Sequence, residues 1–68
     1  MSVLKVIEVL GNSTVSFEDA VKNVIKEASH SVKNIQSVYV NHMYVDVKNN
    51  AVTEYRVNTK VTFKIIHE

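Results

Sequence analysis

The sequence predicts an α+β fold of β-α-β-β order, with a three-stranded antiparallel sheet wrapped around one helix. An apolar run at residues 3–10 ends at the only glycine of the chain. Apolar side chains then recur at three- and four-residue spacing over residues 17–33, which is typical of an amphipathic helix. Two long extended stretches follow, residues 35–47 and Ala51–Ile66, and the few residues between them predict a hairpin.

The first strand and the helix have clear local signals. Val, Ile and Leu dominate residues 3–10, and the Gly-Asn-Ser-Thr cluster at residues 11–14 is typical of a turn. Ser16 is a good helix N-cap because its hydroxyl can accept a hydrogen bond from a free amide of the first turn. Two carboxylates follow it, where they favour the positive end of the helix dipole. We therefore expect the helix to span residues 17–33.

The two later strands differ in their alternation. In the last strand one face should pack under the helix. Its residues are Tyr55, Val57, Thr59, Val61, Phe63 and Ile65. In the middle strand strict alternation puts Val38, Val40 and Tyr44 on the face away from the helix, which predicts an interface there rather than plain solvent. Asn49 and Asn50 suit a tight hairpin turn because asparagine tolerates positive φ.

The predicted helix is too short to cover the predicted hairpin. A helix of about 17 residues is ~25 Å long, whereas a strand of about 14 residues reaches ~47 Å. The chain has 68 residues, no cysteine and no His/Asp/Glu cluster with zinc spacing. A chain of this size is a marginal monomer without disulfides, a metal or self-association. We therefore expect one domain, residues 1–68, that forms a homo-oligomer.

Charge and motifs exclude several classes of function. The formal net charge is +1, with eight Lys/Arg among seven acids, so a nucleic-acid partner is not expected. Lys5 and Glu8 interrupt the apolar N-terminal run, which indicates neither a signal peptide nor a membrane span. We expect a cytoplasmic protein. No Ser/His/Asp arrangement suggests a triad and no glycine-rich loop could cradle phosphate, so an enzyme is not expected.

The chain resembles the dodecin family in its length and in four sequence segments that occur in the same order. The segments are KVIEVLG at residues 5–11, SFEDAV at 16–21, VKNI at 32–35 and EYRVNTKVTF at 54–63. The resemblance covers residues 3–66. It implies a β-α-β-β protomer assembled from trimers into a hollow dodecameric shell. Flavin-binding members of the family store riboflavin-like compounds, such as riboflavin or FMN, in stacked pairs near the three-fold axes.

Three residues occupy flavin-site positions of the family: Ser37, His42 and Arg56. Flavin-binding dodecins carry a tryptophan where Ser37 stands and a glutamine where Arg56 stands, at the same spacing (56 − 37 = 19). The resemblance also places His42 along the flavin cavity. Loss of a stacking ring removes roughly 1–3 kcal/mol per ring face, by analogy with base stacking. Arginine has no acceptor for the N–H groups of a flavin. We therefore expect weak flavin binding at an altered site.

A minority branch, described as calcium-binding dodecin, shares the small residue at the tryptophan position and the Tyr-Arg step. It implies Ca²⁺ as another ligand, for which Glu8, Asp46 and Glu54 are the acidic groups on predicted strands. Ca²⁺ takes six to eight oxygens, so neighbouring subunits would have to contribute some of them. Arg56 has two roles open: contact with an anionic or planar ligand, or a salt bridge to Asp46, Glu54 or a neighbouring subunit's acid.

Two functions from different classes remain. The first is a non-enzymatic small-ligand binding and storage protein of the dodecin type, whose altered site holds flavin weakly, another small ligand or calcium. The alternative is a structural oligomeric assembly with no ligand in the vestigial flavin pocket. The tyrosines Tyr39, Tyr44 and Tyr55 fit both, because they can stack on a ligand or pack across strands at an interface.

Overall fold

The computed structural model describes residues 2–66 and has the predicted element order. β1 spans Ser2–Ser13, α1 spans Phe17–Ala28, β2 spans Ile35–Lys48 and β3 spans Ala51–Ile66. The sheet order is β1-β3-β2 and both pairs are antiparallel, so the last strand of the chain is the central one. The predicted α+β fold class is confirmed.

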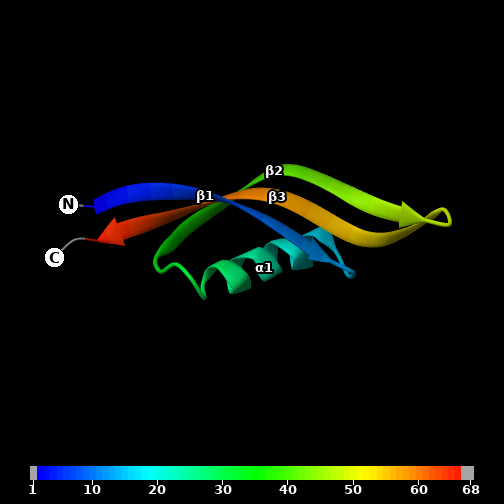
Figure 1. The fold of residues 1–68 in the computed structure, drawn as a ribbon, viewed down its shortest axis with the longest axis horizontal. Coiled ribbons are helices and arrows are strands. Elements are labelled where there is room, and N and C mark those ends of the chain that lie inside the picture. The colour runs from blue at the N-terminus through cyan, green and yellow to red at the C-terminus, as the bar shows by residue number, and fades with distance from the viewer. Residues whose placement is uncertain (1, 67–68) are drawn as a thin grey trace.

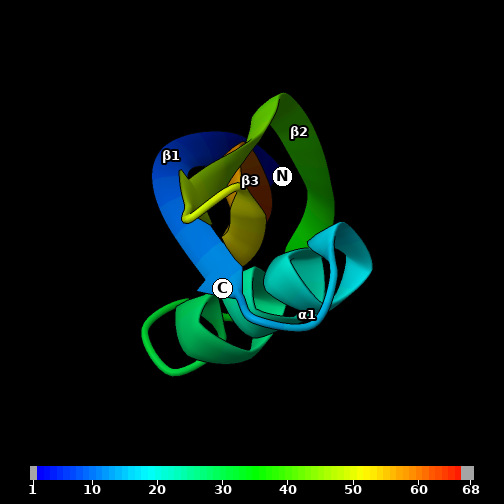
Figure 2. The ribbon, with the colours of Figure 1, turned by 90° about the vertical axis from the view of Figure 1, so that its right-hand side faces the viewer.

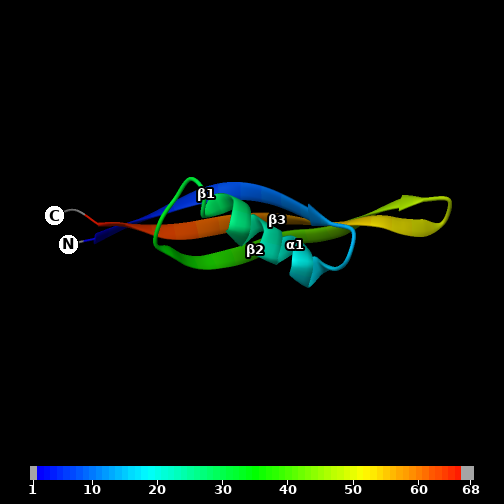
Figure 3. The ribbon, with the colours of Figure 1, turned by 90° about the horizontal axis from the view of Figure 1, so that it is seen from below.

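The molecule is elongated, with α1 against the middle of one sheet face (Figure 1). Its principal dimensions are 54 × 19 × 14 Å. The start of β1 and the end of β3 pair side by side, and the turn between β2 and β3 forms the opposite end (Figure 1). Seen along the long axis, the strands coil and α1 stays on one side of them (Figure 2). Figure 3 shows α1 crossing the strands obliquely, so both ends of the sheet extend beyond the helix.

The hydrophobic core lies between α1 and the central strand. Ala20 and Val24 of α1 pack against Val57 and Val61 of β3, and all four are fully buried. Partly buried side chains surround them: Ile7, Val9, Phe17, Val21, Ile35, Val38 and Val40. Thr59, also buried, donates its hydroxyl to the Val9 carbonyl oxygen at 2.7 Å, which satisfies the polar group inside the core. The alternation predicted for the last strand is therefore confirmed at residues 57–61.

β1 is longer than the sequence predicts. The turn expected at residues 11–14 begins later, because Gly11, Asn12 and Ser13 still pair with β3. The carbonyl oxygen of Asn12 accepts a hydrogen bond from the Asn23 side-chain amide at 3.1 Å, which ties the end of this edge strand to α1. Gly11 does not end the strand. It lets β1 approach α1 closely, since a Cβ there would meet the helix.

α1 is shorter than the sequence predicts. The expected last residue is Lys33, whereas the helix ends at Ala28 with Ser29 as its C-cap. Two amides beyond the cap bond to the Ala28 carbonyl oxygen at 3.0 and 2.9 Å and close the last turn. Asn34 then adopts a left-handed φ of 62°, which directs the chain into β2. The serines and histidine of residues 29–31 are weak helix formers, which explains the early end.

The N-terminus of α1 is capped as predicted, since the Ser16 hydroxyl accepts a hydrogen bond from the Asp19 amide at 3.0 Å. Replacing such a serine by alanine costs about 1 kcal/mol. We expect Ser16→Ala to lower the free energy of unfolding by about that amount, measured by urea denaturation at fixed protein concentration. Ser31→Ala, at an exposed position beyond the helix, is the control. Equal stability of Ser16→Ala and the wild type would contradict this role.

The hairpin turn forms where predicted, but β2 is irregular. Asn49 and Asn50 have φ of 53° and 61°, the positive pair that a type I′ turn requires. The register between β2 and β3 skips Gln36 and Asn41, so each is an extra residue that forms a bulge in β2. Strict alternation of side chains between the two faces therefore stops at these positions.

The bulge at Asn41 overturns one prediction. Strict alternation puts Val38 and Val40 on the same face as His42 and Tyr44, away from the helix. In the structure Val38 and Val40 pack against the core, whereas His42 and Tyr44 pair with residues of β3 that point away from it. The interface predicted on this face therefore lacks the two valines and keeps Tyr44.

Candidate ligand-binding site

The sheet face away from α1, called the outer face from here on, carries the candidate residues Ser37, His42 and Arg56. Its residues in β3 are Glu54, Arg56, Asn58, Lys60, Thr62 and Lys64. Directly paired residues of an antiparallel sheet point to the same face, and Ser37 and His42 pair with Thr62 and Asn58. The bulge at Asn41 makes this possible. Without it, residues five positions apart on one strand would point to opposite faces.

The three candidate residues share a face but do not meet. His42 lies opposite Asn58, two residues along β3 from Arg56, which is about 7 Å at ~3.4 Å per residue. Ser37 lies opposite Thr62, six residues from Arg56, which is about 20 Å along the strand. One small planar ligand cannot contact both ends of that row. A site containing Ser37 and Arg56 together therefore needs residues from two copies of the chain.

Arg56 is held by two carboxylates. Its Nε lies 2.6 Å from Asp46 Oδ2 and its Nη2 lies 2.8 Å from Glu54 Oε2. The Asn12 side-chain amide donates to the other oxygen of Glu54 at 2.8 Å, so the network joins all three strands. The hydrogen bond and the charge of Asp46 raise the pKa of Arg56 above its usual value. The salt-bridge role expected for Arg56 is therefore present within one protomer.

The network of Arg56 engages two of the three predicted calcium ligands, Asp46 and Glu54. Asp46 and Glu54 face each other across β2 and β3, but the cation between them is Arg56. Glu8 lies opposite Lys60, six residues from Glu54 along β3, or about 20 Å. In residues 2–66 no three His, Asp or Glu side chains converge as a metal site would require. The acidic groups of residues 2–66 therefore do not form a Ca²⁺ site within one protomer.

The three tyrosines divide between the two faces. Tyr55 packs on the inner face, where its ring meets Phe17 edge-on with centroids 5.1 Å apart and planes at 78°. Tyr39 and Tyr44 stand on the outer face with 65% and 52% of their surface exposed. Tyr55 is therefore part of the protomer's own packing, and the other two rings remain available to a ligand or a neighbouring subunit.

Asn58 is a further outer-face residue with an unusual environment. The side-chain oxygen of Asn58 is buried and has no hydrogen-bond partner within the described part of the chain. Nothing in the sequence distinguishes this asparagine, because its burial depends on the side chains that the pairing brings around it. A buried acceptor without a partner costs about 1–3 kcal/mol, so its position needs a physical reason.

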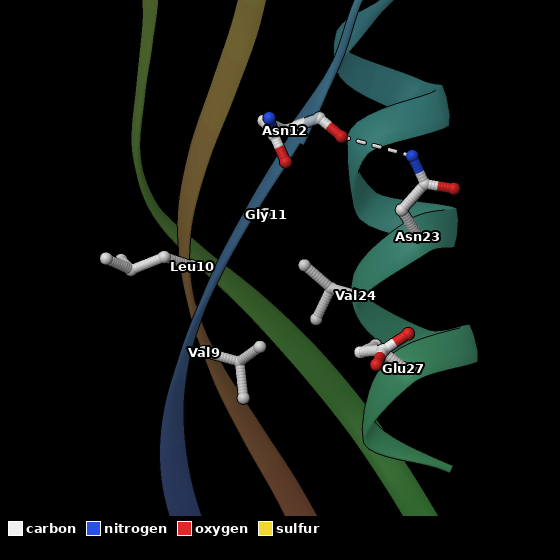
Figure 4. A pocket seen from close by; sticks show the side chains of 7 residues that line it. All are labelled: Val9, Leu10, Gly11, Asn12, Asn23, Val24 and Glu27. Carbon is white, nitrogen blue, oxygen red and sulfur yellow. Dashed lines mark hydrogen bonds between the residues drawn. The ribbon is translucent and has the colours of Figure 1, made fainter. Parts of the chain in front are cut away.

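A hollow of about 270 Å³ lies away from these residues, between the end of β1 and α1 (Figure 4). Its lining residues are Val9, Leu10, Gly11, Asn12, Asn23, Val24 and Glu27. Figure 4 shows Val9 and Val24 facing each other between strand and helix, while Leu10 points to the other side of the strand. None of the ligand-binding residues predicted from the sequence lines this hollow, and Glu27 is its single carboxylate. The outer face therefore remains the candidate ligand-binding site.

The protomer exposes more surface than a compact monomer of its size. Its accessible surface is 5100 Å², whereas folded monomers of 7.7 kDa expose about 4300 Å². The excess of roughly 800 Å² equals the area that one partner buries in a standard interface. On β1 the large apolar side chains Leu4, Val6 and Leu10 are 59%, 54% and 70% exposed. Such a surface is typical of a subunit that associates with copies of itself.

The fold defines the class: a small β-α-β-β protomer whose outer sheet face is open. The chain belongs to the dodecin family, whose model matches residues 3–66. It is 34% identical over 65 residues to the calcium dodecin of Mycobacterium tuberculosis. The aligned region covers 96% of this chain and 92% of that protein.

Solved dodecin structures share the fold. The dodecin from Streptomyces davaonensis superimposes with a TM-score of 0.92 at 21% identity and covers 97% of both chains. The crystal structure of the calcium dodecin from Mycobacterium tuberculosis gives 0.81 at 31% identity, over 94% of this chain and 91% of that one. It is described as a calcium-chelating antigen with a novel calcium-binding site. Within residues 2–66, no helix is both long enough and apolar enough to cross a bilayer.

Proposed function

We propose that the chain is a non-enzymatic, cytoplasmic storage protein of the dodecin type, a homododecameric shell that holds a small ligand between its subunits. One observation carries the proposal: about 20 Å of strand separates Ser37 from Arg56, so the ligand positions of one protomer cannot act together. Membership of the dodecin family supports it. The surface left uncovered on each protomer supplies the driving force for assembly.

The ligand site is an altered flavin site that binds flavin weakly. Ser37 offers no ring face, and the guanidinium of Arg56 already donates to Asp46 and Glu54. Arg56 also has no acceptor for a ring N–H. Each lost stacking face removes roughly 1–3 kcal/mol, which is about one to two decades of affinity.

A titration that follows the quenching of flavin fluorescence tests this proposal. The assembled protein is added to riboflavin and, separately, to FMN, and we expect dissociation constants in the micromolar range or weaker. Ser37→Trp restores the missing ring and should tighten binding about 10- to 100-fold. Ser31→Trp places the same ring at an exposed turn and should not.

The results of this titration distinguish the two predicted functions, ligand storage and a structural assembly without a ligand. Tight quenching by the unchanged protein at sub-micromolar concentration would contradict the altered site. No binding at any accessible concentration, with Ser37→Trp equally inert, would favour the structural assembly with a vestigial pocket.

Calcium is the second candidate ligand, favoured by the 34% identity to a protein named calcium dodecin. Because Arg56 occupies the space between Asp46 and Glu54, a Ca²⁺ ion would need carboxylates from different copies, with Glu8 as the remaining strand acid. Such a site would raise the stability of the assembly by about 2.7 kcal/mol at a hundredfold excess of Ca²⁺ over its dissociation constant. An unchanged melting temperature in saturating Ca²⁺ would exclude it.

A further inference from the structure

The orphan oxygen of Asn58 lies at the centre of the outer face. Asn58 belongs to the central strand and pairs with Leu10 of β1 on one side and His42 of β2 on the other. Its side-chain oxygen has almost no surface exposed to water and no hydrogen-bond partner in residues 2–66. Its neighbour Leu10 is 70% exposed. A donor that reached this oxygen would therefore remove an existing penalty.

The bulge at Asn41 places two tyrosines on the same face as Asn58. Because Asn41 is an extra residue, Tyr39 and Tyr44 both lie on the outer face, although they are five positions apart in β2. They pair with the residues two positions on either side of Asn58, so each ring stands about 7 Å along the sheet from it. Exposed tyrosine rings offer flat apolar surfaces on which a planar molecule can stack.

We propose that Asn58 is the hydrogen-bond acceptor of the ligand site, for a planar heterocycle that carries a ring N–H and stacks on Tyr39 or Tyr44. This inference rests on the proposed function and deepens it. Arg56 has only donors, and it bonds to the carboxylates of Asp46 and Glu54. Asn58 therefore supplies the unpaired acceptor on this face of β3, and Tyr39 and Tyr44 supply the stacking surface.

The test compares riboflavin with 3-methylriboflavin, in which a methyl group replaces the hydrogen on the ring nitrogen. Flavin fluorescence reports both affinities for the assembled wild type, for Asn58→Leu and for Asn58→Asp. We expect the wild type to prefer riboflavin by about five- to tenfold, the size of one neutral hydrogen bond. Asn58→Leu should bind both flavins equally, and Asn58→Asp, which keeps an acceptor, should retain the preference. Asn58→Val, with a good strand former, replaces Asn58→Leu if that variant does not fold.

A second readout checks the stacking rings and the orphan oxygen. Of Tyr39→Leu and Tyr44→Leu, the variant that removes the stacking ring should weaken both flavins to the same extent, because it leaves the acceptor in place. The ligand-free Asn58→Leu assembly should melt no lower than the wild type, since it loses an unpaired buried acceptor. A clear drop in its melting temperature would show that Asn58 is bonded within the assembly and would overturn the proposal.

The remaining outcomes distinguish the acceptor role of Asn58 from the proposed storage of flavin. Equal binding of the two flavins by the wild type overturns the role of Asn58 and leaves the proposed function intact. No binding of either flavin, even by the Ser37→Trp variant, overturns flavin storage itself and the role of Asn58 with it.

Discussion

Gly11→Ala should destabilise the protein, by a net amount of about 1–2 kcal/mol. A Cβ at this position would collide with Cγ2 of Val24 and lie 3.0 Å from the backbone oxygen of Ala20, so strand and helix must move apart. Overpacking a core costs about 1–3 kcal/mol. Alanine recovers about 0.4–1 kcal/mol through the unfolded chain, because Gly11 does not need a positive φ. Urea denaturation at fixed concentration measures the difference.

Val24→Ala provides the matched control for Gly11→Ala. It removes the side chain that the new Cβ would meet first, so in that background the second substitution should cost clearly less. Thr14→Ala, an exposed substitution just beyond β1, should change little. Additive effects of Gly11→Ala and Val24→Ala would show that close approach of β1 to α1 is not the reason for this glycine.

Leu4→Glu should break the assembly into smaller species. Leu4 lies on the outer face, is 59% exposed in one protomer and pairs with Lys64 of β3. A glutamate there gains an opposite charge across the strand pair, so the protomer itself should not suffer. At a contact between copies the same carboxylate would replace an apolar side chain and lose its water, with Lys64 as its one neighbouring charge, and disrupting such a contact costs about 2 kcal/mol or more. Light scattering at micromolar concentration measures the change in mass.

His30→Glu is the control for this substitution. It also adds one carboxylate, at an exposed turn after α1 and outside the sheet. We expect its mass to equal that of the wild type. A Leu4→Glu protein that keeps the full mass would show that this part of the outer face remains in water.

Much of the fold follows from local sequence signals, because those signals are specific. The Asn49-Asn50 pair predicts the hairpin turn, and both residues adopt the positive φ that asparagine tolerates. Ser16 predicts the start of α1. The errors occur where tertiary contacts decide. Gly11 reads as a strand end, yet it serves the contact between strand and helix, which no local pattern reports. The helix ends at Ala28 because weak helix-forming residues follow it, and each of them lowers helix stability only slightly.

The site could be predicted less completely than the fold. The expected salt bridge of Arg56 is present, since Asp46 and Glu54 are the acids that the hairpin brings beside it. The bulge at Asn41 has no sequence signature, and it decides which side chains of β2 face outward. The burial of the Asn58 oxygen depends on that same register. Residues of the site are therefore visible in the sequence, but their grouping is not.

The central claim is that the protomer shelters its outer face and completes its ligand site only by joining other copies. The native mass in solution, from light scattering coupled to gel filtration at micromolar concentration, tests it most directly. We predict a single species close to twelve times the 7.7 kDa chain mass. A stable, well-folded species of one chain mass would contradict it.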